Sequence, residues 1–265
     1  MEILGYISAV IIGVSLGLIG GGGSILTVPI LVYIFDKDAV TATAYSLFIV
    51  GVTSLIGSFN YMKKNLVEFR TALIFSVPAF IAVFLSRKFL IPSLPEEFFT
   101  IDSFRFTKEI FIMTLFALLM IAAAFSMIRN KRPEKDIETS GLNYPAIFFY
   151  GFITGILTGT VGAGGGFLII PALVLLAKLP MKMAVGTSLL IIAVNSLIGF
   201  TGDILSGIFF DWKLLIIFSI LAATGIFSGS FLSGFISGSK LKPAFGWFIL
   251  TMGIYIIITE LFFNS

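Results

Sequence analysis

Long apolar segments with few charges follow one another along the chain. The main ones are residues 3–18, 40–62, 71–86, 110–128, 183–202 and 243–259. Each approaches the ~20 apolar residues that a helix needs to cross a lipid bilayer. None shows the ~10-residue segments of alternating polarity that a transmembrane barrel requires. The pattern predicts an all-α polytopic membrane protein.

The two halves of the chain repeat one another. With a shift of 142 residues, residues 13–59 align with residues 155–201 without a gap, and 18 of the 47 pairs are identical. Such internal similarity indicates a duplicated unit. The segment between the copies is polar and contains a proline, which is typical of an exposed linker. We predict a first membrane repeat at residues 1–128, a cytoplasmic linker at 129–143 and a second membrane repeat at 144–265.

A glycine cluster interrupts the first apolar unit of each half. As one helix, residues 3–35 would reach roughly 50 Å at 1.5 Å per residue, too long for an ordinary span. Glycines occupy positions 20–23 in this unit, and positions 162 and 164–166 in the second copy. Each glycine disfavours helix by about 1 kcal/mol relative to alanine. The unit either crosses the membrane once as a broken helix or turns back at the glycines as a re-entrant hairpin.

The distribution of basic residues favours the hairpin. A hairpin plus three transmembrane helices per half inverts the second half, and one side of the membrane then carries eleven lysines and arginines. The other side carries six, namely Lys37, Arg87, Lys88, Arg105, Lys108 and Lys213. A single crossing per unit divides the same residues nine to eight, whereas cytoplasmic segments are normally enriched in basic residues. We predict an inverted repeat in the bacterial inner membrane, with both termini extracytoplasmic.

The amino-acid composition limits the kinds of site that the protein can contain. Hydrophobic residues make up 58% of the chain and charged residues 12%, and the mean hydropathy is +1.09, so the lipid bilayer is the expected surrounding. The absence of cysteine and histidine excludes disulfides, thiolate chemistry and the usual zinc sites. We expect no cofactor, no metal and no nucleic-acid partner. The N-terminus lacks the basic start of a cleavable signal peptide, so the first helix is expected to remain. Composition leaves open whether the protein forms a homodimer.

The helix breaks have the form of an anion site. After each break a short apolar helix, at residues 24–35 and 166–177, presents free N–H groups and a positive dipole end. The span that follows adds hydroxyl and amide groups. Our candidate substrate-binding residues are Gly21, Gly22, Gly23, Ser24, Tyr45, Ser46, Gly164, Gly165, Gly166, Thr187, Ser188 and Asn195. The alternative is that the glycines only allow close helix packing and that the hydroxyls bond their own helices.

Charged groups are expected to be absent from the membrane interior. The spans contain no arginine that we expect to be buried, so the half-helix ends alone would hold an anion. The candidate proton carriers Glu68, Asp203, Asp211 and Glu260 lie near the ends of helices. None of them is therefore a strong candidate for an intramembrane acid.

The motifs together resemble the TauE/SafE sulfite exporter family, also called TSUP. The resemblance rests on the two glycine clusters, each followed by a proline at Pro29 or Pro171, and on residues 184–189, Ala-Val-Gly-Thr-Ser-Leu. It covers nearly the whole chain. It implies a duplicated transporter that moves small sulfur-containing or organic anions, such as sulfite or sulfoacetate, with proton coupling. The first copy departs from the pattern because Tyr45 stands where the second has Thr187.

Several functions compete at this point. The leading hypothesis is a secondary transporter that exports a small anion by movement of the halves around the paired breaks. An anion channel would share the repeats and dipoles but would pass ions without coupling. An enzyme is disfavoured, because without histidine or cysteine no spacing suggests a nucleophile with its base. ATP-driven transport would need a partner subunit, since the chain has no Walker sequence.

Overall fold

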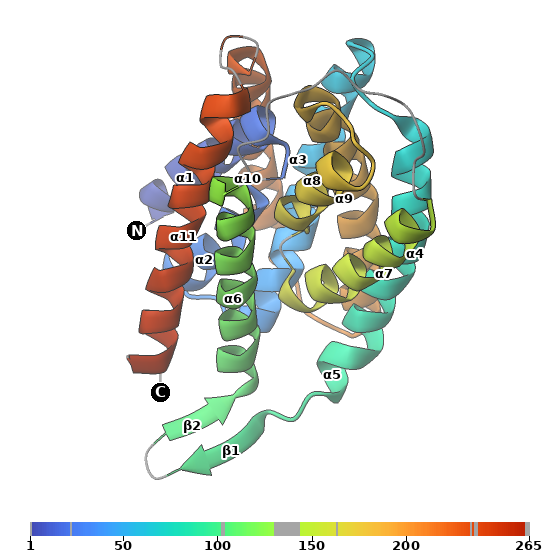
Figure 1. Ribbon diagram of the computed structural model, residues 1–265. Coiled ribbons are helices and arrows are strands. Elements are labelled where there is room, and N and C mark those ends of the chain that lie inside the picture. Colours follow the sequence, from blue (N-terminus) through green and yellow to red (C-terminus); the bar gives the residue numbers. More distant parts are fainter. Residues whose placement is uncertain are drawn as a thin grey trace.

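The computed structural model describes residues 2–21, 23–101, 104–129, 144–162, 164–233, 235 and 238–262. Nearly all of them are helical (Figure 1). The first half holds α1 (Glu2–Ile19), α2 (Ser24–Tyr33), α3 (Ala39–Lys63), α4 (Phe69–Leu85), the π-helical turn η1 (Ser86–Leu90), α5 (Ile91–Ser93), β1 (Glu97–Ile101), β2 (Phe104–Thr107) and α6 (Lys108–Arg129). The second holds α7 (Tyr144–Val161), α8 (Gly166–Leu175), α9 (Met181–Leu205), α10 (Trp212–Leu232) and α11 (Gly238–Phe262).

Several of these helices can cross a bilayer. Among the described residues, five are long and apolar enough: Ala39–Lys63, Phe69–Ser93, Lys108–Phe125, Met181–Leu205 and Trp212–Leu232. Apolar side chains on their outer faces are exposed, whereas a buried cluster that includes Leu16, Leu189 and Phe218 joins the two halves. The prediction of an all-α polytopic membrane protein is confirmed.

The chain reverses direction at the glycine cluster of each half. A Cβ atom on Gly5, near the start of α1, would lie 2.3 Å from the ring of Phe35, just after α2. The rings of Tyr6 and Phe35 also meet edge to face at 5.8 Å. In the second half, Gly165 at the start of α8 packs against Thr158 of α7. Gly20 and Gly162 begin these turns with positive φ angles of 80° and 69°. Other residues avoid this conformation.

The middle helices of the two halves, α3 and α9, pack antiparallel. Gly57 of α3 lies against Leu189, and Gly199 of α9 lies against Leu47. These four positions are equivalent in pairs under the 142-residue repeat. Antiparallel packing of equivalent helices is what inverted halves require, whereas parallel halves would align the two helices. The sidedness of the termini in the membrane stays a prediction.

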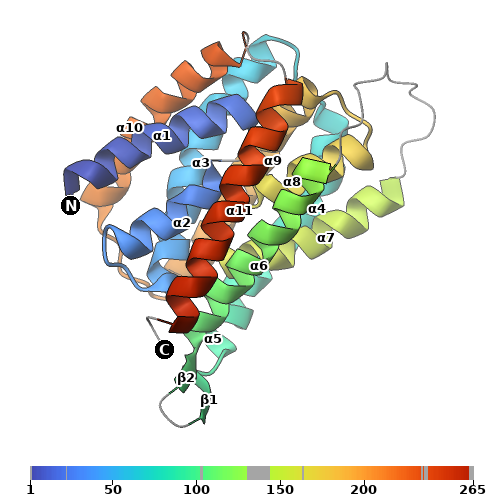
Figure 2. The ribbon, with the colours of Figure 1, turned by 60° about the vertical axis from the view of Figure 1, so that its left-hand side comes forward.

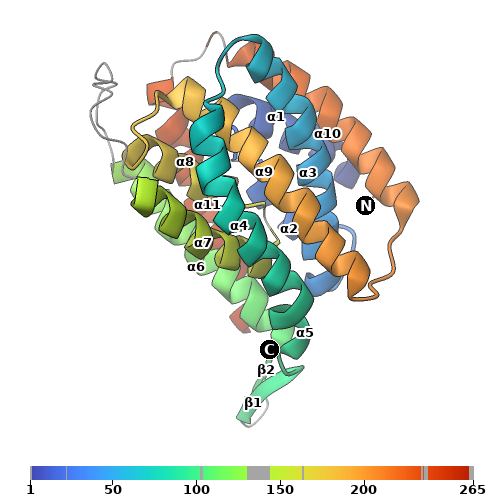
Figure 3. The same ribbon diagram turned by 90° about the vertical axis from the view of Figure 1, so that its right-hand side faces the viewer.

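The other helices are arranged symmetrically around this pair. Contacts order a row α7, α4, α9, α3, α10, α1, visible in Figure 3, in which the hairpin helix of one half packs against the fourth helix of the other. Small residues make both close approaches: a Cβ on Gly13 would lie 1.9 Å from the Ala222 carbonyl, and one on Gly155 would lie 2.4 Å from the Ala79 carbonyl. In front of the row, α6 and α11 pack side by side (Figure 2).

Two carboxylates begin the fourth helices rather than facing the interior. The Glu68 side chain accepts a hydrogen bond from the backbone N–H of Thr71. The Asp211 side chain accepts one at 3.1 Å from the N–H of Leu214. Both are N-caps, which satisfy free N–H groups at a helix start. Neither residue therefore acts as a carboxylate in the middle of the membrane.

The segment after α5 forms a short β-hairpin. In β1 and β2, Phe99 pairs with Phe106 and their rings stack at 5.0 Å. This hairpin, absent from the prediction, lies at the same end of the molecule as the C-terminal end of α11 (Figure 1). Residues 130–143, which include nearly all of the predicted linker, lie outside the described residues, so the domain boundaries stay predictions.

Candidate functional site

The two glycine breaks are in contact with each other. A Cβ on Gly21 would lie 2.1–2.3 Å from backbone atoms of Gly166, and one on Gly166 would lie 2.1 Å from the Cα of Gly21. Such distances leave room for no side chain at either position. Helices α2 and α8 therefore bring their N-terminal ends together from opposite halves. The candidate Gly22 lies outside the described residues.

Neither of these two helix ends is capped by a side chain. Gly23 precedes α2 and Gly165 precedes α8, and glycine has no capping group. The Ser24 hydroxyl is directed back into the turn and donates to the Gly21 carbonyl at 2.7 Å. The two ends thus carry backbone N–H groups and dipoles without a capping carboxylate or hydroxyl.

Each break packs on the middle helix of the other half. Gly20 lies against Val185 and Ser188 of α9, and Gly162 lies against Thr43 of α3. Gly164 lies against both middle helices, since a Cβ there would lie 2.8 Å from the Val50 side chain of α3 and 2.9 Å from the Ser196 hydroxyl of α9. Any movement of one half against the other therefore changes the surroundings of both breaks.

Tyr45 and Thr187 occupy equivalent positions and make equivalent contacts. The Tyr45 hydroxyl accepts a hydrogen bond at 2.5 Å from the backbone N–H of Asp211. Thr187 accepts one at 2.9 Å from the N–H of Glu68. Each hydrogen bond holds the residue that begins the fourth helix of the opposite half. Tyr45 and Thr187 therefore have the same structural role although they are different residues. Their role in substrate binding stays a prediction.

Other candidate groups line the buried interior without a partner. Ser46 and Asn195 are buried, and neither the Ser46 hydroxyl nor the Asn195 carbonyl oxygen has a hydrogen-bond partner among the described residues. The hydroxyls of Ser54 and Ser196, which are repeat equivalents, are also unpaired within that part of the chain. Ser188 instead donates to the Val185 carbonyl of its own helix at 2.8 Å. Unpaired buried polar atoms are costly and frequently mark a binding site or water.

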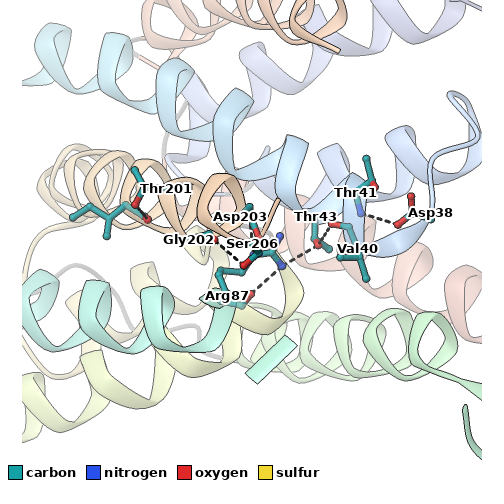
Figure 4. Close-up of polar contacts among 11 residues, drawn as sticks. Asp38, Val40, Thr41, Thr43, Arg87, Thr201, Gly202, Asp203 and Ser206 are labelled. Carbon is teal, nitrogen blue, oxygen red and sulfur yellow. Dashed lines mark hydrogen bonds and ion pairs between the residues drawn. The ribbon is translucent and has the colours of Figure 1, made fainter. Parts of the chain in front are cut away.

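A buried ion pair joins Arg87 of η1 to Asp203 of α9 (Figure 4). Arg87 is 1% exposed, and its Nε lies 2.8 Å from Oδ1 and 3.0 Å from Oδ2 of Asp203. Its Nη1 donates to the Thr43 hydroxyl at 3.0 Å and to the Gly159 carbonyl at 3.3 Å. The expectation that the spans contain no buried arginine is wrong. Asp203, which we did not expect to be a strong intramembrane acid, is only 1% exposed.

The position of these charges was misjudged because of where the helices end. Arg87 directly follows the apolar segment 71–86, and Asp203 directly follows 183–202, so both were assigned to helix ends. The helical segment continues instead through η1 and α5 to Ser93, and α9 continues to Leu205. The available signal in the sequence was that the apolar residues Phe89, Leu90 and Ile91 follow Arg87 and Lys88.

Comparison with known proteins gives the family. The model of the family "Sulfite exporter TauE/SafE" matches residues 6–258. The chain belongs to the TauE/SafE sulfite exporter family. The TauE/SafE match spans both halves, including the two breaks and the Arg87–Asp203 pair.

Relatives of this TauE/SafE protein occur in bacteria and archaea. A probable membrane transporter protein of Xylella fastidiosa strain 9a5c is 29% identical over 93% of this chain and 91% of its own length. A probable membrane transporter protein of Methanocaldococcus jannaschii is 31% identical over 71% of this chain and 67% of its own. Another, from Bacillus subtilis, is 29% identical over 77% and 80%. TauE/SafE membership indicates a multi-pass membrane transporter rather than an enzyme.

Proposed function

We propose that this protein is a secondary transporter that exports a small organosulfur or sulfur oxyanion, such as sulfite or sulfoacetate, with proton coupling. The anion is held between the N-terminal ends of α2 and α8. The observation that carries the proposal is the meeting of these two uncapped ends, where the backbones of Gly21 and Gly166 are in contact.

The physical argument rests on the charge of a helix end. Each N-terminus carries a partial charge of roughly +0.5 elementary charge, so two converging ends present about one positive charge to a ligand. The free N–H groups of each first turn would replace part of the water that the anion loses. Glycine at the contact lets the backbone itself approach the ligand.

The arrangement of the halves supports alternating access. Antiparallel α3 and α9 form the centre of a symmetric row, and each break packs on the middle helix of the opposite half. Rocking of one half against the other would expose the breaks first to one side of the membrane and then to the other. The family description and the names of the relatives agree with transport.

The test is anion flux in liposomes that contain the purified protein. Gly166→Ala and Gly21→Ala place a methyl group against the opposite backbone and are expected to reduce sulfite and sulfoacetate flux strongly. Gly253→Ala in α11 is the control, because the nearest atom to an added Cβ there belongs to the flexible Ile121 side chain, at 3.0 Å. Folded break variants that transport like the wild type would contradict the proposed site. Electrodiffusive currents that ignore a proton gradient would identify an anion channel instead.

A further inference from the structure

The Arg87 guanidinium has one donor group left over. Nε pairs with Asp203, and Nη1 pairs with Thr43 and with the Gly159 carbonyl. Nη2 is buried and has no hydrogen-bond partner among the described residues. Charged donors without a partner are expensive to bury. An oxyanion is the ligand that a guanidinium fork binds best, since two parallel N–H groups match two oxygens.

The surroundings of Arg87 connect it to the second break. Thr43 touches Gly162, which begins the turn, and Gly159 lies in the last turn of α7 just before it. Arg87 itself lies in the π-helical turn η1, a helix irregularity that is frequent at functional sites. The guanidinium is therefore joined to the break by two of its hydrogen bonds.

The positions equivalent to Arg87 and Asp203 in the repeat hold uncharged residues. At the 142-residue spacing Tyr61 corresponds to Asp203, and its hydroxyl donates at 3.0 Å to the Gly17 carbonyl, the equivalent of the Gly159 carbonyl. In the fourth helices, where the spacing is 143, Ser230 corresponds to Arg87 and is likewise buried. Neutral groups thus satisfy the packing at this place in the fold. The charges of the second half are additional to what the architecture needs.

We propose that Arg87 is a second anion contact and that Asp203 is the proton carrier that releases it. When Asp203 is ionised, it neutralises Arg87, and the anion has no free cation to bind. When the Asp203 carboxylate takes up one proton, it becomes a neutral acid, and Arg87 pairs with the entering oxyanion. Loss of the anion returns Arg87 to Asp203, and the proton leaves. A buried guanidinium needs one negative partner at every stage, so one anion and one proton bind together and cross in the same direction, and export is driven by the outward gradient of the anion.

Few other charges act on this exchange. Among the described residues, Arg87 is the charged group that interacts with the Asp203 carboxylate. Thr43 from α3 and the Gly159 carbonyl from α7 are its neutral neighbours. Lys88, the next residue of η1, is exposed, and its ammonium lies over the rings of Phe84 and Phe89. Since the pair is sealed from solvent here, anion and proton reach it only after the halves move.

Variants of the pair separate a binding role from a structural one. Arg87→Gln alone leaves the Asp203 carboxylate buried without its positive partner. The double variant with Arg87→Gln and Asp203→Asn has two neutral groups at these positions, which the fold tolerates. We expect the folded double variant to bind sulfoacetate about tenfold or more weakly, because its charged donor is gone. Lys88→Gln removes a charge from the same turn and is expected to bind like the wild type. A double variant with wild-type affinity would show that the pair is structural only.

Asp203→Asn tests the coupling, because asparagine imitates the protonated acid. We expect this variant to exchange sulfoacetate between liposomes and medium at equal pH, but to lose accumulation driven by a pH gradient. Retained gradient-driven accumulation would overturn the role of Asp203. If this variant does not fold, the wild type answers the question. Sulfoacetate stays fully ionised near neutral pH, so any proton taken up when it binds must be taken up by the protein. We expect the protein to take up one proton for each anion bound. Binding without proton uptake would refute the proposal.

This inference rests on the proposed function, but the two fail separately. If wild-type liposomes carry neither sulfite nor sulfoacetate, the proposed function fails. If the wild type transports them with a proton gradient and both pair variants do the same, only the role of Arg87 and Asp203 fails.

Discussion

Replacement of Gly13 by alanine tests the close packing of α1 on α10. The added Cβ would lie 1.9 Å from the Ala222 carbonyl oxygen, whereas ordinary contact begins near 3.4 Å. The atoms in contact are backbone, so no side chain can turn aside, and the helices must separate by roughly 1.5 Å at this point. Overpacking of this kind costs about 1–3 kcal/mol. Because Gly155 makes the equivalent contact with Ala79, Gly155→Ala should have a similar effect.

The assay is thermal unfolding of the purified protein in detergent. A loss of about 1–3 kcal/mol corresponds to a fall of roughly 2–12 °C in Tm for a chain of this size. Gly253→Ala is the matched control, a helical glycine whose nearest contact is the flexible Ile121 side chain at 3.0 Å. It gains the same helix propensity, and its nearest backbone contact, the Ala117 carbonyl at 3.2 Å, is far milder than those at Gly13 and Gly155. If Gly13→Ala and Gly155→Ala unfold no earlier than this control, the close packing of the hairpin helices on the fourth helices is not as described.

Three further predictions follow from particular contacts. Tyr45→Phe and Thr187→Val each leave a backbone N–H without its acceptor and should destabilise the protein by about 1–3 kcal/mol in the same unfolding assay; no change would mean that these hydroxyls are free for substrate. Asn195→Leu should weaken sulfoacetate binding in calorimetry if its unpaired amide oxygen faces the ligand site, whereas unchanged affinity would remove Asn195 from that site. A reporter fused after Ser265 should be extracytoplasmic, and a cytoplasmic signal would overturn the topology.

The backbone plan was largely predictable because duplication and glycine are strong signals. Gly20 and Gly162 lie where the chain adopts positive φ angles. The glycine cluster recurs at the same place in both halves, which indicated that it has a structural role. The count of basic residues then distinguished inverted from parallel halves, and the antiparallel packing of α3 and α9 agrees with that choice. Local chemistry and symmetry therefore sufficed for the arrangement of helices.

The site was less predictable because burial depends on tertiary contacts. Nothing in the apolar pattern around Arg87 shows that η1 continues the helix and turns its side chain toward Asp203, which is 116 residues away. Similarly, nothing in the sequence shows that the Tyr45 hydroxyl accepts a hydrogen bond from the Asp211 backbone, and its role in substrate binding stays a prediction. The sequence does not distinguish polar side chains that form hydrogen bonds between the halves from polar side chains that bind a substrate.

The most direct test of the account is a structure of the protein with sulfoacetate bound. We predict that the anion lies at the meeting point of α2 and α8, with its oxygens within hydrogen-bonding distance of backbone N–H groups from both breaks. A sulfoacetate molecule bound elsewhere, with the ends of α2 and α8 still packed against each other, would contradict the central claim.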